Sequence, residues 1–88
     1  MFDIKIDSDN NRILAEIIVD SYFFDSSKYE YAFYLFRNDE KFDLSWYSSN
    51  MSVTFNIEVI PGEYQIKAYI KDLRDNSKRR FMSKKIIK

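Results

Sequence analysis

Residues 53–70 read VTFNIEVIPGEYQIKAYI, and this stretch decides the fold class. Apolar residues alternate with polar ones on both sides of Pro61 and Gly62, which are the only proline and the only glycine of the chain. Such alternation is typical of strands with one buried and one exposed face. Proline fixes one dihedral angle of a tight turn, and glycine tolerates a positive φ there. The stretch therefore predicts a strand over 53–59, a sharp turn, and a second strand over 64–71.

Tyr64 stands directly after this turn, at the start of the second strand. In a tyrosine corner, a tyrosine near the start of a strand bends back, and its hydroxyl bonds a backbone group a few residues upstream. The order Ile60-Pro61-Gly62-Glu63-Tyr64 has this layout. We therefore expect Pro61, Gly62 and Tyr64 to form a structural corner at one end of a β-sandwich.

The rest of the chain continues the alternation, interrupted by clusters of Asp, Asn and Ser. Further strands are expected over 2–6, 13–19, 29–36, 41–46 and 81–87, and a loop whose Tyr22, Phe23 and Phe24 pack on the core is expected over 21–28. In the strand over 41–46, Phe42, Leu44 and Trp46 alternate with Lys41, Asp43 and Ser45. Strands separated by turns every 8–12 residues, roughly, favour an all-β fold, an immunoglobulin-like β-sandwich of about seven antiparallel strands. A small barrel is the alternative.

The length of 88 residues allows a single domain, 1–88, and the aromatic share of 18% gives it enough large side chains for a core. No apolar run is long enough to span a membrane. The chain starts without the layout of a signal peptide. Its origin is therefore open between a cytoplasmic protein and a domain excised from a larger surface or periplasmic protein.

The chain contains no cysteine and no histidine, which excludes disulfides, thiol chemistry and zinc sites built from these ligands. The paired carboxylates lie in expected turns, at Asp39-Glu40 and at Asp72 and Asp75, where Asp is common for backbone reasons. Residues 7–11, DSDNN, resemble the start of a calcium loop but lack its glycine and its closing glutamate. We expect no enzymatic activity, no catalytic residue, no cofactor and no metal site.

The aromatic residues suggest a candidate binding face. If Phe33 and Leu35 face the core, their neighbours Tyr34 and Phe36 point to the opposite face, and the same reasoning on the strand over 64–71 places Tyr69 there. The strands over 29–36 and 64–71 are neighbours in this fold, so Tyr34 and Tyr69 are expected side by side. The candidate binding face comprises Tyr34, Phe36, Tyr47 and Tyr69. Ligand binding, docking of another domain and plain support of the sheet are alternative roles for these rings.

The chain has no net charge, but residues 78–88 carry six basic side chains and no acid. We expect this basic terminal strand to lie beside acidic neighbours in the sheet. Proteins that bind single strands of nucleic acid combine basic grooves with stacking rings, and this tail has only Phe81. We therefore expect no binding to nucleic acid.

About half of the chain resembles a known family. The resemblance rests on Tyr31-x-Phe33-x-Leu35, Trp46, Phe55-x-Ile57 and Pro61-Gly62-x-Tyr64-x-Ile66, which are similar to bacterial three-tyrosine (Y_Y_Y) domains and, more loosely, to fibronectin type III modules. Phe33 and Phe55 depart from the family, where hydroxyl-bearing rings are usual. The resemblance implies a non-catalytic accessory module for protein–protein contact or spacing within a larger bacterial protein. A carbohydrate-binding module that uses the aromatic face is the alternative.

Overall fold

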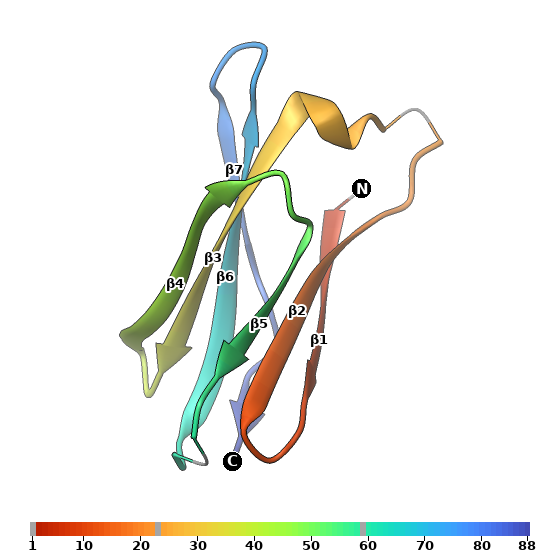
Figure 1. The fold of residues 1–88 in the computed structure, drawn as a ribbon. Coiled ribbons are helices and arrows are strands. Elements are labelled where there is room, and N and C mark those ends of the chain that lie inside the picture. The colour runs from red at the N-terminus through yellow and green to blue at the C-terminus, as the bar shows by residue number, and fades with distance from the viewer. Residues whose placement is uncertain (1, 23, 59) are drawn as a thin grey trace.

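The computed structural model describes residues 2–22, 24–58 and 60–88, which form two antiparallel sheets packed face to face (Figure 1). The first sheet has the order β1-β2-β5, with β1 (Phe2–Ser8), β2 (Arg12–Val19) and β5 (Ser52–Asn56). The second has the order β4-β3-β6-β7, with β4 (Glu40–Ser48), β3 (Tyr29–Arg37), β6 (Glu63–Asp72) and β7 (Lys78–Met82). A short β8 (Ile86–Ile87) pairs with β6, and one turn of 3-10 helix, η1 (Ser26–Lys28), leads into β3. The predicted β-sandwich is confirmed, and the barrel alternative is wrong.

The core lies between the two sheets and is built from alternate residues of their central strands. On β3 and β6 the predicted inward residues Phe33, Leu35, Ile66 and Ala68 are all buried. The other buried members of the core are Ile13, Ala15, Ile17, Tyr31, Phe55, Ile57, Tyr64 and Ile70. Because β3 and β6 pair along their full length, the side chains between these positions all point to the outer face of the second sheet.

The turn before β6 is a tyrosine corner, as predicted. Tyr64 is fully buried, and its hydroxyl donates a hydrogen bond of 2.6 Å to the carbonyl oxygen of Ile60. Gly62 has a φ of 155°, and a Cβ at this position would lie 2.8 Å from Nε of Arg37. A side chain here would therefore meet both backbone strain and a steric clash.

The corner is also held by the β3–β4 hairpin and by the C-terminus. Asn38 and Asp39 have positive φ values of 51° and 67°, which give the two-residue turn that suits the twist of paired strands. The side-chain oxygen of Asn38 accepts a bond of 2.9 Å from the backbone N–H of Glu63. Nε of Arg37 donates to the carbonyl of Pro61 at 2.8 Å. Gly62 exchanges two backbone bonds with Lys88.

The predicted strands over 53–59 and 81–87 differ most from the observed ones, and the other boundaries lie within two residues of prediction. β5 ends at Asn56 instead of continuing to residue 59, because Glu58 adopts a positive φ of 50°, and Val59 itself lies outside the described residues. The expected strand over 81–87 is divided into β7, which starts earlier at Lys78, and β8. The division falls at Ser83, whose buried hydroxyl accepts a bond of 2.9 Å from the backbone N–H of Ile66 and so interrupts the regular ladder.

The loop over 21–28 follows the prediction only in part. Phe24 packs against Phe2 and Tyr29, with ring centroids 5.4 Å and 5.0 Å away. Tyr22 does not tuck onto the core, since it is fully exposed. Phe23, the third expected ring, lies outside the described residues.

Replacing Tyr64 with Phe should lower the free energy of unfolding by about 1–3 kcal/mol, because the carbonyl of Ile60 loses its partner. Tyr31→Phe is the matched control: Tyr31 is also fully buried, but its hydroxyl has no hydrogen-bond partner among the described residues. Removing that hydroxyl should leave stability unchanged or raise it. Denaturant melts of the two variants measure both effects. Equal stabilities would show that the corner hydrogen bond does not stabilise the fold.

Candidate binding face

The register between β3 and β6 brings the predicted rings together on the outer face of the second sheet. Tyr69 lies opposite Ala32, two pairs along from the pairing of Tyr34 with Lys67 and therefore on the same face. The ring centroids of Tyr34 and Tyr69 are 5.2 Å apart, with an angle of 85° between the ring planes. Their predicted adjacency is therefore confirmed.

β4 adds two further rings because its pairing with β3 is irregular. The register shifts by one residue between the pairs Tyr31–Ser48 and Phe33–Ser45, and again beyond Leu35–Asp43. A β-bulge of this kind places an extra residue on one strand and re-aims its side chains. Trp46 and Tyr47 lie in the first bulged segment, and both line the same outer face as Tyr34.

The regular alternation read from residues 41–46 is thereby corrected. A regular strand would bury Phe42, Leu44 and Trp46 together. Leu44 instead stands opposite Tyr34 on the outer face and is 42% exposed, and Trp46 is 63% exposed. The two neighbouring large rings of Trp46 and Tyr47 break the alternation in the sequence itself. That break is the one sign in the sequence that the facing changes here, but the pairing with β3 decides which ring points outward.

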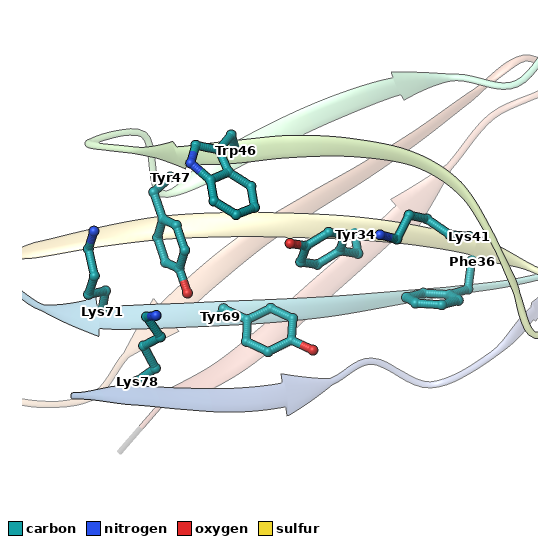
Figure 2. Close-up of a pocket in the computed structure, with 8 residues that line it drawn as sticks. All are labelled: Tyr34, Phe36, Lys41, Trp46, Tyr47, Tyr69, Lys71 and Lys78. Carbon is teal, nitrogen blue, oxygen red and sulfur yellow. The ribbon is translucent and has the colours of Figure 1, made fainter. Parts of the chain in front are cut away.

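The aromatic side chains of β3, β4 and β6 line a shallow, open depression of about 440 Å³, which we call the aromatic trough (Figure 2). Its lining comprises Tyr34, Phe36, Lys41, Trp46, Tyr47, Tyr69, Lys71 and Lys78. All four residues of the predicted binding face contribute to it. The volume lies at the lower end of the range of roughly 300–1,000 Å³ that is usual for small-molecule sites.

The rings of the trough meet edge to face. Tyr34 lies 6.5 Å from Trp46 with an interplanar angle of 85°, and Trp46 lies 5.3 Å from Tyr47 at 80°. Edge-to-face contacts place the positive ring edge against the negative ring face and fix the rings relative to one another. The trough is therefore a set of rings in crossed orientations, as Figure 2 shows, and not a row of parallel faces.

Three of the aromatic faces carry an ammonium group. Nζ of Lys41 lies 4.9 Å from the ring centroid of Tyr34, and Nζ of Lys71 lies 4.7 Å from that of Tyr47. Lys67 lies in the same way 4.3 Å from the ring centroid of Phe36. These cation–π contacts stabilise the half-buried rings and hold positive charge against them. The sequence did not indicate these lysines, because their position depends on strand pairing.

The electrostatics of Tyr47 follow from its neighbours. Burial raises the pKa of the Tyr47 phenol, and the nearby hydroxyls of Tyr34 and Tyr69 raise it further. The phenol therefore stays neutral at physiological pH and keeps its O–H as a hydrogen-bond donor.

The basic tail contributes to this face from β7. Lys78 stands opposite Lys71, and Arg80 stands opposite Tyr69. The expectation of acidic neighbours is wrong for these two residues. It holds for Lys85, which lies 3.0 Å from the carboxylate of Glu63 and 3.5 Å from that of Asp39.

The carboxylates of the turns have structural partners. Asp72 pairs with Arg74 at 2.8 Å, and this contact holds the pKa of Asp72 at about 2. Asp9, in the sequence that resembles a calcium loop, pairs with Arg12 at 2.6 Å. In residues 2–22, 24–58 and 60–88 no group of three or more acidic side chains is arranged to hold a metal ion. A carboxylate with a pKa near 2 is poorly suited to acid–base catalysis near neutral pH.

The chain matches no known family, no curated protein and no solved structure. Within the described part of the chain, no helix is long and apolar enough to cross a membrane.

Trp46 is the only tryptophan of the chain, so its fluorescence reports on the trough alone. Iodide quenches free tryptophan more efficiently than caesium, so the informative quantity is the ratio of the two quenching constants divided by the same ratio for N-acetyltryptophanamide. Because Trp46 is 63% exposed beside Lys41 and Lys71, we expect this normalised ratio to exceed one at equal ionic strength, to approach one in the unfolded chain and to fall towards one at high salt. A normalised ratio of one or less in the folded protein would contradict the placement of positive charge around this ring.

Proposed function

We propose that this domain is a non-catalytic accessory module that binds a partner through the aromatic trough. The observation that carries the proposal is the exposure of Trp46 beside Tyr34, Tyr47 and Tyr69 on one sheet face. Large rings offer extensive contact area at low cost in conformational entropy. Exposed apolar patches of this kind commonly mark sites of interaction.

The resemblance to three-tyrosine domains supports the same role. Domains of that family are non-enzymatic modules within larger bacterial proteins. On this reading the partner is a neighbouring domain or another protein. Docking of a neighbouring domain would remove Trp46 from solvent. Iodide should then quench the fluorescence of Trp46 less in a chain that includes that domain than in the isolated domain.

A carbohydrate is the second candidate partner, and the shape and chemistry of the trough favour it. The cores of protein–protein interfaces are depleted in lysine, whereas Lys41, Lys71 and Lys78 all line the trough. The depression also holds three tyrosines, whose hydroxyls both donate and accept hydrogen bonds. A hollow with rings and polar groups suits a polar ligand better than a flat protein surface.

The trough can be tested by nuclear magnetic resonance with a ¹⁵N-labelled chain and a panel of neutral and acidic oligosaccharides. Binding should shift the indole N–H of Trp46 and the amides of β3 and β6. Trp46→Ala should weaken binding about fivefold or more. Leu14→Ala is the matched control, because Leu14 is a partly exposed apolar residue on the outer face of the opposite sheet.

Shifts confined to β1, β2 and β5 would place the binding surface on the first sheet and contradict binding at the aromatic trough. The absence of any shift with every oligosaccharide would remove carbohydrate as the partner.

A further inference from the structure

The outer face of the second sheet concentrates positive charge in a chain with no net charge. Lys41, Lys71 and Lys78 line the trough, and Arg80 stands opposite Tyr69 beside it. Glu30 pairs with Lys71 at 3.2 Å and neutralises part of this charge, and no ion pair to Lys41, Lys78 or Arg80 is found among the described residues. The trough is therefore a locally basic surface, and its charge complements an anionic ligand.

The position of the lysines on the rings discriminates between neutral and anionic ligands. The face of Tyr34 is covered by Lys41, and the face of Tyr47 is covered by Lys71. Lys71 keeps its ion pair with Glu30 when it leaves the ring of Tyr47, so the face of Tyr34 discriminates more strongly. A neutral sugar that stacks on Tyr34 must displace the ammonium group of Lys41 without offering it a new partner. An anionic group offers such a partner, so the lysine can leave the ring face while the apolar side of the ligand takes its place.

The remaining groups of the trough suit a ligand with many hydroxyls. Tyr34, Tyr47 and Tyr69 each bring a phenolic O–H that donates and accepts hydrogen bonds. Among the described residues, no lysine or arginine lies over the rings of Trp46 and Tyr69, which leaves them open to the C–H face of a sugar ring.

From these observations we infer that the aromatic trough binds an acidic polysaccharide, whose carboxylate or sulfate groups pair with Lys41, Lys71 and Lys78 while its sugar rings pack on Trp46 and Tyr69. The inference rests on the proposed function and names the ligand class of the same face. Each acidic sugar unit combines an anion, several hydroxyls and one apolar face, and the trough has groups that complement all three.

Single-stranded nucleic acid also combines anions with flat rings, but the structure favours it less. Successive bases stack on aromatic side chains along a basic groove. The rings of the trough instead meet at angles of 80° and 85°. Nucleic-acid-binding domains usually have an isoelectric point above about 9, whereas the value for this chain is about 6.2.

The test compares an acidic oligosaccharide with its uncharged methyl ester and adds two further anionic ligands. Isothermal titration calorimetry of the 88-residue chain would use tetragalacturonate, its fully methyl-esterified form, a chondroitin sulfate oligosaccharide and an oligothymidylate. At least one of the two acidic sugars should bind about tenfold more tightly than the uncharged ester. Its affinity should fall as salt rises from about 0.01 M to 1 M, because the screening length falls from about 30 Å to 3 Å.

Variants assign the binding to the trough. Lys41→Gln and Lys78→Gln should each weaken binding of the acidic sugar about threefold to fivefold, with little effect on the methyl ester. Lys5→Gln is the control, because Lys5 lies exposed on β1, in the opposite sheet. Thermal melts of each variant exclude a loss of fold as the cause.

The outcomes separate this inference from the proposed function. Tetragalacturonate and its ester could bind with equal affinity, and Trp46→Ala could abolish both interactions. That result would contradict the preference for an acidic ligand but would still support the trough as a binding site. Tighter binding of oligothymidylate than of both acidic sugars would assign the face to single-stranded nucleic acid. If none of the four ligands binds, the inference of an acidic polysaccharide is wrong. The proposed function then keeps only a neighbouring domain or another protein as its partner.

Discussion

The second sheet depends on the turn before β6, and the hydrogen bond from the hydroxyl of Tyr64 to the carbonyl of Ile60 holds that turn. It holds residues 60–63 in a turn that also binds the β3–β4 hairpin, through Asn38, and the C-terminus, through Lys88. Three segments that are distant in the sequence therefore meet at one corner. Because that corner sets where β6 begins, it also sets the register in which β6 pairs with β3.

The register of β3 and β6 then determines which side chains reach the outer face. A slip of one residue would exchange the inner and outer faces of a strand, and it would bring Tyr69 and Lys71 into the core. Burial of Phe33 and Leu35 against Ile66 and the other core residues opposes such a slip. The positions of the exposed rings are thus enforced by the packing of the buried ones.

The sequence predicts the parts of this arrangement that depend on alternation within a strand. Tyr34, Phe36 and Tyr69 were assigned to the outer face correctly for this reason, and Tyr64 was recognised from its turn. Trp46 was not, because a bulge is a property of two paired strands and changes the facing of residues that look regular alone. The lysines of the trough were missed because Lys41, Lys71 and Lys78 come from three strands, and only the pairing order brings them together.

The same irregularities also protect the edges of the sheet. β4 and β7 form its two edges, and an exposed regular edge readily pairs with another chain. The bulges of β4 distort one edge, and Lys78, Arg79 and Arg80 place three positive charges along the other. Lysines held over Tyr34 and Tyr47 likewise cover these half-buried rings and present ammonium groups at the surface. Like charges on two copies of this face repel each other, so the charges at the trough oppose association of the chain through its exposed rings.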